Sequence, residues 1–410
     1  MADSSLLIYL LAAGAALLTA WLLRRYWQER QYRRQPYVAP THAHWASLPP
    51  PTQAPLHRVA LIGDLGAVAT DGTDPVLQLL DQWQHDTGSH GTVILLGDNV
   101  YPTGLPAPTH PGRAAAEARF SAQLDVLRRF KGQVVFLSGN HDWNKGRPDG
   151  WEYLRHQEAY VREQLPTAHY LPPDGAPGPV SLQLAEGLLL VVLNTQWWVQ
   201  RGPRPASNPK EPLRQLWHLL DANRHQQVLI AGHHPLYSNA LHGGKFTAKQ
   251  HVFPLTTIHK QAYLPLPFLG SLLPLYRQLF GAAEDMAHPP YRKLRRRLLR
   301  VLHQFPNIIY AAGHDHNLQY FHYRQGHYLV SGAGSKTAFV QKGGNASFVH
   351  EHKGFFSLDM YSPSELWLRV LEPATGPASA GPEVFRLPLP GSEAAATAPA
   401  SPARRRGQDV

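Results

Sequence analysis

The stretch Val59-Ala60-Leu61-Ile62-Gly63-Asp64-Leu65-Gly66 joins an apolar run to a polar turn, and this pattern recurs four more times along the chain. Each time, an apolar run leads into a glycine, directly or after Ser138 in one case, and then into side chains that carry oxygen or imidazole nitrogen. The five turns are Gly63-Asp64-Leu65-Gly66, Gly97-Asp98-Asn99-Val100-Tyr101, Gly139-Asn140-His141-Asp142, Gly232-His233-His234-Pro235 and Gly313-His314-Asp315-His316. Short apolar runs that end at glycine are typical of buried strands. Because parallel strands end at one edge of a sheet, loops at that edge can converge on one site.

The composition restricts what such a site could bind. The chain has 410 residues and no cysteine, which excludes disulfides, thiolate zinc sites, iron–sulfur clusters and cysteine nucleophiles. A metal would therefore be held by oxygen and imidazole, and two cations about 3.5–4 Å apart would need several such side chains from different loops. The formal net charge of +10 favours an anionic partner, such as a phosphate substrate, an anionic lipid or nucleic acid.

Taken one by one, the polar side chains are ambiguous. Asp64 and Asp98 could each be a turn or helix-capping residue, but two aspartates that each follow a buried strand favour a metal site. Asp98 is our candidate for a carboxylate that bridges two ions. His314 and His316 are two residues apart, so in an extended segment they point the same way and can divide between two ions. Tyr101 is either a packing aromatic or a phenolate that suits Fe3+.

The N-terminus carries an uncharged apolar run, from Leu6 to Leu23, that is about long enough to cross a bilayer as a helix. We therefore predict a transmembrane anchor at residues 5–23, with a buried helix as the alternative. The run is followed by a cluster of arginines: Arg24, Arg25, Arg30, Arg33 and Arg34. The positive-inside rule puts this side, and with it the catalytic domain, in the cytoplasm.

The rest of the chain divides by composition. Residues 24–56 are rich in proline and arginine and are expected to form a linker. Helices predicted at 75–84, 112–130, 151–164 and 212–223 alternate with strands, and a run of strands ends the domain at residue 371. This order predicts an α/β sandwich with two sheets. Residues 372–410 are rich in Pro, Ala, Gly and Ser and are expected to be disordered.

One segment of the domain stands apart. Within the insertion 243–290, residues 263–276 are apolar and aromatic but contain too many prolines for a helix or a central strand. Residues 291–302 form a basic amphipathic helix, which either lies on an anionic membrane or has one solvated face in the domain. With the anchor nearby, residues 263–302 are a candidate for membrane contact.

Together the five turns resemble the signature of the calcineurin-like metallophosphoesterases, in the variant carried by purple acid phosphatases. The motifs occur in the order Gly-Asp-x-Gly, Gly-Asp-x-x-Tyr, Gly-Asn-His-Asp, a histidine at a strand end and Gly-His-x-His. The likeness is closest to the small tartrate-resistant acid phosphatase type, and it covers roughly residues 57–371. It implies an α/β fold that is a four-layer αββα sandwich of two mixed β-sheets, here preceded by the N-terminal transmembrane helix.

The resemblance also implies two metal sites that share one carboxylate. By motif position, one metal is held by Asp64, Tyr101 and His316, the second by Asn140, His233 and His314, and both by Asp98. The resemblance implies Fe3+ at the tyrosine site and Fe2+, Zn2+ or Mn2+ at the other. His141 and His242 hold the places of two histidines that are not ligands: the first would approach the substrate phosphate, and the second would protonate the leaving oxygen.

The implied function is hydrolysis of phosphomonoesters by attack of a metal-bound hydroxide. A phosphodiesterase that acts on nucleotides or lipid-linked substrates is one alternative, and a membrane-tethered binding module without turnover is another. The insertion 243–290 would lie beside the mouth of the active site as a lid. We do not expect nucleic acid as a partner, because the positive charge is spread over linker, helix and tail. The sequence leaves the oligomeric state open.

Overall fold

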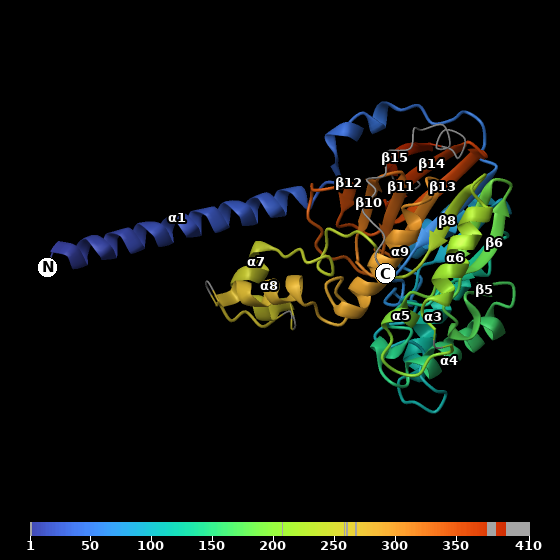
Figure 1. Cartoon of the computed structure of the whole chain (residues 1–410), viewed down its shortest axis with the longest axis horizontal. Coiled ribbons are helices and arrows are strands. Elements are labelled where there is room, and N and C mark those ends of the chain that lie inside the picture. The colour runs from blue at the N-terminus through green and yellow to red at the C-terminus, as the bar shows by residue number, and fades with distance from the viewer. Residues whose placement is uncertain are drawn as a thin grey trace, which may run out of the picture.

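Two β-sheets packed face to face form the centre of the molecule (Figure 1). The computed structural model describes residues 2–206, 208–257, 259, 261–266, 269–374 and 383–390. One sheet has seven strands in the spatial order β15 (Glu383–Pro390), β14 (Glu365–Leu371), β13 (Phe355–Ser362), β2 (His57–Ile62), β3 (Gly91–Leu95), β4 (Gln133–Phe136) and β5 (His169–Tyr170). Strands β2 to β5 run parallel, and β13, β14 and β15 pair antiparallel.

The second sheet has eight strands. Their spatial order is β1 (Tyr37–Val38), β12 (Ala346–His350), β10 (Leu318–Tyr323), β11 (Gly326–Ser331), β9 (Ile308–Ala312), β8 (Gln227–Ala231), β7 (Leu188–Val192) and β6 (Val180–Ala185). Strands β11, β9, β8 and β7 are parallel, and the outer pairs are antiparallel. Both sheets are therefore mixed, which confirms the prediction of an α/β fold with two mixed sheets.

The alternation of side chains along β2 explains the layers. Successive residues of a strand point to opposite faces. Val59 and Leu61 belong to the core between the two sheets, whereas Ala60 and Ile62 belong to a second core on the outer face. Because both faces of β2 are buried, the strand is apolar throughout rather than alternating.

Helices close both outer faces. The seven-stranded sheet is covered by α2 (Pro75–Thr87), α3 (Arg113–Leu127) and α4 (Gly150–Gln164), which bury residues such as Leu80 and Phe120. The other sheet is covered by α6 (Glu211–Ala222) and α9 (Pro289–Leu302), through residues such as Leu216 and Leu298. The order helix, sheet, sheet, helix is the four-layer arrangement. Asp74 begins α2 because its carboxylate accepts hydrogen bonds from the amides of Val76 and Leu77.

The N-terminal helix α1 (Ala2–Tyr32) extends away from the sheets (Figure 1). No helix in the described part of the chain combines the length and the apolar character that a membrane span needs. The structure therefore does not confirm the predicted transmembrane helix at residues 5–23. The side chains of residues 2–8 and of Leu11, Leu18, Leu22 and Tyr32 lie outside the described part.

The expected linker at residues 24–56 is wrong in two respects. First, α1 continues to Tyr32. Second, β1 pairs with β12 and so adds an edge strand to the eight-stranded sheet. Arg33 forms an ion pair with Glu351 at 2.5 Å, and the ring of Trp45 lies 5.9 Å from that of Phe385. These long-range contacts attach the proline-rich segment to the domain.

The expected disordered tail is wrong at residues 383–390, which form β15 on the edge of the seven-stranded sheet. Phe385 is buried in the core between the sheets, 4.9 Å from the ring of Phe348. Arg386 and Arg369 both pair with Glu383. Residues 375–382 and 391–410 of the predicted tail lie outside the described residues.

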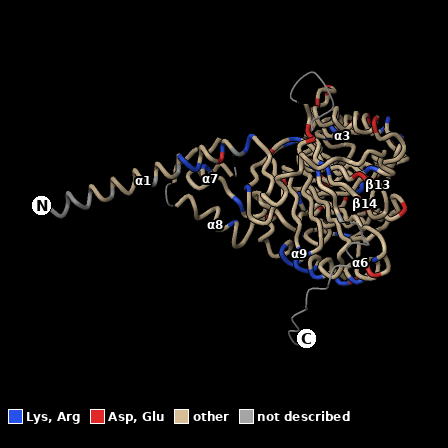
Figure 2. Tube along the Cα trace, turned by 90° about the horizontal axis from the view of Figure 1, so that it is seen from above, with Lys and Arg blue, Asp and Glu red and all other residues tan. Residues whose placement is uncertain are grey.

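The insertion 243–290 includes a helix that begins within residues 263–276, where the prolines had argued against one. It forms the helices α7 (Ala248–Val252) and α8 (Leu272–Leu279), with the short turns η5 (Pro254–Thr257) and η6 (Leu269–Ser271) between them. Pro274 is the third residue of α8, where its missing N–H leaves no intrahelical hydrogen bond unmade. The insertion lies beside α1 (Figures 1 and 2), and the amide of Ala248 donates to the carboxylate of Glu29 at 3.2 Å.

Candidate metal centre

The five turns meet where strands of both sheets end. Three follow β2, β3 and β4 of one sheet, and two follow β8 and β9 of the other. Backbone hydrogen bonds join them: Asp64 N donates to Gly97 O at 2.9 Å, and Gly313 N donates to His233 O at 3.0 Å. Gly63 N also donates to Ser331 O at 2.8 Å, across the two sheets. The loops are therefore positioned by the ends of the sheets.

A first group of donor atoms surrounds the phenol of Tyr101. Its Oη lies 2.7 Å from Asp64 Oδ1 and 2.9 Å from His316 Nε2. The same oxygen lies 3.2 Å from Asp98 Oδ2, and His316 Nε2 lies 3.4 Å from Asp64 Oδ1. Four side chains from three loops thus present oxygen and nitrogen atoms to one small volume.

A second group surrounds the side-chain amide of Asn140. Its Oδ1 lies 2.9 Å from His233 Nε2 and 3.0 Å from His314 Nδ1. The two imidazole nitrogens are 3.2 Å apart. All three residues are buried, so the group offers one oxygen and two nitrogens in a site with little access for water.

Asp98 lies between the two groups. Its Oδ2 is the atom that approaches Tyr101, while its Oδ1 lies 3.5 Å from His233 Nε2. Donor atoms of Asp64, Asp98 and His233 all lie within 4.8 Å of one another. The structure thus brings together all seven residues that the sequence predicted as ligands, and one carboxylate faces both groups.

In two of the histidines, one ring nitrogen donates a hydrogen bond to a backbone carbonyl. That bond fixes which nitrogen of the ring faces the donor group. His233 Nδ1 donates to Leu96 O at 2.8 Å, and His314 Nε2 donates to Glu284 O at 2.9 Å. Each imidazole therefore presents a nitrogen lone pair to Asn140 and its surroundings. Backbone carbonyls commonly orient metal-binding histidines in this way.

The backbone at three of these residues is strained. Asp64, Asp98 and His314 have φ values of 62°, 55° and 72°, in the left-handed region that costs side-chain-bearing residues energy. Two glycines allow the loops to approach. A Cβ on Gly97 would lie 2.5 Å from Gly139 N, and a Cβ on Gly139 would lie 2.2 Å from Asp98 Oδ1. Such strain is concentrated at functional sites because the surrounding structure has to support it.

The electrostatics of the centre suit a cation. Burial, followed by the nearby carboxylates of Asp64 and Asp98, raises the pKa of Tyr101 well above its usual value. Burial opposes ionisation of Asp98, but His233 and His141 outweigh it and lower the pKa of that carboxyl to about 2. The centre therefore holds buried negative charge beside oxygen and nitrogen donors. This donor set fits hard or borderline metal ions, and a bound cation would reverse the effect on the phenol.

The two histidines predicted as catalytic lie on either side of these groups. His141 Nδ1 donates to Pro102 O at 2.6 Å, and its Nε2 lies 3.8 Å from Asp98 Oδ2. His242 Nδ1 lies 2.9 Å from Asp285 Oδ1, and the His242 ring lies 4.5 Å from the ring of His314. Burial alone would lower the pKa of His242, but Asp285 and Asp315 raise it to about 9.

Sequence reasoning missed several acidic side chains that hold the centre together. The buried carboxylate of Asp142 accepts hydrogen bonds from the amides of Asp98, Asn99 and Gly139. From the insertion, Glu284 Oε1 accepts from Asn140 Nδ2 at 3.2 Å, and Asp285 pairs with His242. Asp142 is the last residue of a predicted turn and could have been found, but nothing local marks the insertion residues.

A known protein family matches part of the domain that carries these residues. Residues 57–260, about half of the chain, match the family model described as calcineurin-like phosphoesterase. Residues 57–260 belong to this family. The matched range begins at β2, and the structure continues the fold beyond that range to β15. None of the curated proteins matches the chain in sequence.

Solved structures with a similar fold include two phosphatases and an anchor protein. A purple acid phosphatase from yellow lupin (Lupinus luteus) is 16% identical with a TM-score of 0.50, covering 87% of this phosphoesterase chain and 58% of the lupin chain. A dimetal phosphatase from Danio rerio is 12% identical with a TM-score of 0.46, and the match covers 82% of this chain and 99% of the Danio rerio chain. GAP50, described as the anchor in the inner membrane complex of Plasmodium, is 14% identical with a TM-score of 0.47. That match covers 82% of this chain and 88% of the GAP50 chain. The lupin similarity concerns the fold alone.

Proposed function

We propose that this chain is a membrane-anchored, dinuclear metal-dependent phosphatase that hydrolyses phosphomonoesters. The observation that carries the proposal is Asp98, whose two carboxylate oxygens face two separate groups of donor atoms. A carboxylate in this position can hold two cations close together and reduce their mutual repulsion. Family membership supports the broader assignment as a metal-binding phosphoesterase.

We assign the two metal ions to the two groups of donors. Asp64, Tyr101 and His316 would hold Fe3+, because a phenolate is a ligand that suits a trivalent ion. Asn140, His233 and His314 would hold Fe2+, Zn2+ or Mn2+, because a neutral amide and two imidazoles suit a divalent ion. When bound, such ions supply Lewis-acid activation of water and neutralise phosphate oxygens.

His242 is proposed as the general acid for the leaving oxygen. Its Nδ1 is held by Asp285, which fixes the ring and leaves Nε2 as the nitrogen that can deliver a proton. Because its pKa is raised to about 9, the imidazole carries that proton at neutral pH. His141 would bind a phosphate oxygen, since its Nδ1 is already occupied by Pro102 O and its Nε2 faces the centre.

We also propose that α1 anchors the enzyme to a membrane, with the phosphatase domain on the cytoplasmic side. The apolar run in α1 supports this, as do the exposed rings of Trp21 and Trp27 near its end. Figure 2 shows Lys and Arg along α9 and where α1 nears α7, and basic residues on the cytoplasmic side favour this orientation. Residues 263–302 would then lie close to the lipid surface.

A phosphodiesterase acting on lipid-linked or nucleotide substrates is the second candidate. It is favoured by the exposed apolar side chains of the insertion, including Tyr263, Leu264 and Leu269. The insertion reaches the centre through Glu284, so an apolar part of a substrate could lie along it. This alternative changes the ester class and leaves the metal centre as proposed.

The test combines metal analysis with a pair of substrates. Purified full-length protein is expected to contain about two metal ions per chain. It should release nitrophenol faster from a nitrophenyl phosphomonoester than from the corresponding bis(nitrophenyl) phosphodiester. His314→Ala should lose metal and activity. His218→Ala is the matched control, because His218 is exposed on α6. Faster turnover of the diester would favour the second candidate, and a metal-loaded protein without turnover on either ester would contradict both.

A further inference from the structure

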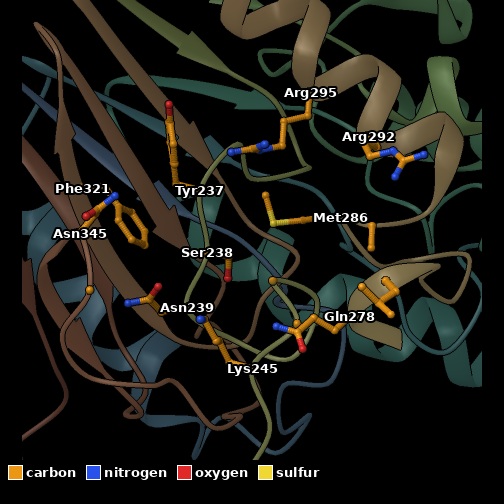
Figure 3. A pocket seen from close by; sticks show the side chains of 15 residues that line it. Tyr237, Ser238, Asn239, Lys245, Gln278, Met286, Arg292, Arg295, Phe321 and Asn345 are labelled. Atoms are coloured by element: carbon orange, nitrogen blue, oxygen red, sulfur yellow. The ribbon is translucent and has the colours of Figure 1, made fainter. Parts of the chain in front are cut away.

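Two cavities outside the metal centre adjoin each other along the insertion. The first, of about 510 Å³, lies between α9, the loop around Ser238 and the insertion (Figure 3). The second, of about 680 Å³, lies between α1 and the helices α7 and α8. Both are lined by Gly244, Lys245 and Gln278. The shared lining places the two cavities side by side, as neighbouring compartments.

The first compartment is cationic. Figure 3 shows Arg292 and Arg295 entering from α9 and Lys245 lying across the cavity from them. Among the described residues, the side chains of Lys245 and Arg292 have no ion-pair or hydrogen-bond partner, and no carboxylate lines this cavity. Arg295 is held in place by Leu236 O and by the ring of Tyr237, which lies 5.2 Å from its guanidinium carbon. Clustered cations without counter-charges favour an anion between them.

The second compartment exposes more apolar than polar surface, although Arg25, Glu29 and Lys245 also line it. Trp21 of α1 lines one side, and Leu272, Pro274 and Leu275 of α8 line another. Leu272 and Leu275 keep 59% and 48% of their surface exposed, which leaves apolar area that a partner could cover. The buried carboxylate of Glu29 is already engaged with the amide of Ala248, so it joins α1 to the insertion rather than opposing an anion in the first compartment.

We infer that this double cavity binds an anionic membrane lipid. The phosphate-bearing head group would lie beside Lys245 and Arg292, and the hydrocarbon chain would lie between α1 and α8. Charge complementarity selects an anionic head group, and the neighbouring apolar compartment selects an amphiphile over a free anion. Neither inorganic phosphate nor an uncharged apolar ligand would fill both compartments.

The lipid site is separate from the metal centre but adjoins it. None of the seven proposed metal ligands lines either cavity. The loop that carries His242 lies between the lipid site and the metal centre. Met286, which lines the cationic cavity, donates its amide N–H to His242 O at 2.9 Å. Ser238, which also lines it, donates to Asp315 at 2.5 Å. Lipid binding here goes beyond the proposed hydrolysis and does not require it.

The test measures retained lipid by native mass spectrometry of the full-length protein in a nonionic detergent. Phosphatidylglycerol and phosphatidylcholine are added at equal concentration, and the preference for the anionic lipid is compared among variants. Each cation near a lipid surface is worth about 1 kcal/mol, or about fivefold. The double variant Lys245→Ala/Arg292→Ala is therefore expected to reduce the preference for phosphatidylglycerol at least about tenfold.

Matched variants separate the site from general positive charge. Lys293→Ala/Arg296→Ala removes the same charge from exposed positions of the chain that do not line the cavity, and it should leave the preference unchanged. Leu272→Ser/Leu275→Ser should reduce retention of both lipids, while Leu56→Ser, a control at an exposed leucine that lines neither cavity, should not. Asp98→Asn should retain phosphatidylglycerol as wild type does, whatever its effect on hydrolysis.

Four results would overturn the inference. The first is equal retention of the two lipids by the wild-type protein. The second is an equal loss of preference in the two double cation variants. The third is displacement of phosphatidylglycerol by millimolar inorganic phosphate together with no effect of the leucine substitutions, which would assign the cavity to a free anion. A loss of retention in Asp98→Asn would instead place the lipid at the metal centre.

Discussion

The loops after β2, β3 and β4 hold their side chains through the sheet itself, whereas the insertion 243–290 reaches the same centre through a few side-chain contacts. Asp64 and Asp98 follow parallel strands whose backbones are hydrogen-bonded in register. Glu284 and Asp285 instead depend on Asn140, His242 and an ion pair with Arg277.

This difference separates two kinds of functional residue. A donor at the end of a buried strand is placed by short-range sequence and by a rigid sheet. A residue on the insertion is placed by tertiary contacts, and much of the insertion keeps apolar side chains exposed, including Tyr276 and Phe280. The strand-end donors should therefore contribute more to activity than the insertion residues. Three measurements of activity test that ranking, and a fourth tests the stability of the sheets that carry the donors.

The largest effect is expected from Asp98→Asn. The change removes the charge that both donor groups share, so activity toward an aryl phosphomonoester should fall by more than about 100-fold, because even the outer partners of metal sites are worth 10–100-fold. Metal content per chain should fall in parallel. Asp86→Asn is the control, since Asp86 is exposed at the end of α2. Activity retained by Asp98→Asn would contradict the ranking of the strand-end donors above the insertion residues.

A second measurement concerns the stability of the sheets that carry the donors. His327 in β11 is buried, which lowers its pKa to about 3, and its Nδ1 lies 2.9 Å from the hydroxyl of Tyr320. Because the folded pKa lies below the unfolded value, the unfolded chain binds the proton first, and stability is lost as pH falls below about 6.5. From pH 7 to pH 5, wild type should lose about 2 kcal/mol more than His327→Gln in urea unfolding. An identical pH dependence of the two proteins would contradict this.

Asp285→Asn tests the insertion at its strongest contact. The change weakens the hydrogen bond that orients His242 and removes the partner of Arg277. We expect kcat to fall about tenfold, within the range expected for loss of an orienting partner, with metal content unchanged. Asp221→Asn, at an exposed ion pair on α6, should have no effect. A loss larger than that of Asp98→Asn would reverse the proposed ranking.

The smallest effect is expected from Glu284→Gln. The substitution keeps an acceptor for Asn140 Nδ2, and the backbone oxygen that orients His314 is untouched. We expect a change in kcat of about threefold or less, in keeping with the modest value of one hydrogen bond. Initial rates at saturating substrate measure it. A change of about 100-fold, the scale of an orienting metal-site partner, would mean that the insertion supplies a reacting group.

The comparison between loops and insertion also explains what could be predicted. The strands before the five turns, the helices on the outer faces and the meeting of the seven donor residues all followed from short-range patterns. An apolar run that ends in Gly-Asp or Gly-His carries both its burial and its polar end in a few adjacent residues. Parallel pairing then brings such ends to one edge.

The errors share another cause. The linker, the tail and the insertion have compositions rich in proline or small residues, which favour irregular structure locally. In the molecule, β1 and β15 are nevertheless strands, because each lies at the open edge of a sheet that offers unpaired backbone groups. Composition describes a segment alone and contains no information about a partner strand far along the chain.

By itself, the amino-acid sequence determined the family, the two-sheet α/β fold and the residues that could hold two cations, because those features depend on side chains adjacent in the chain. Only the tertiary structure decided how Asp98 divides its two oxygens between the donor groups. It also decided that Glu284 and Asp285 lie at the centre and that Lys245 faces Arg292 across a cavity. These last features join residues that are distant in the chain, and only the packing of α9 and the insertion against the sheets brings them together.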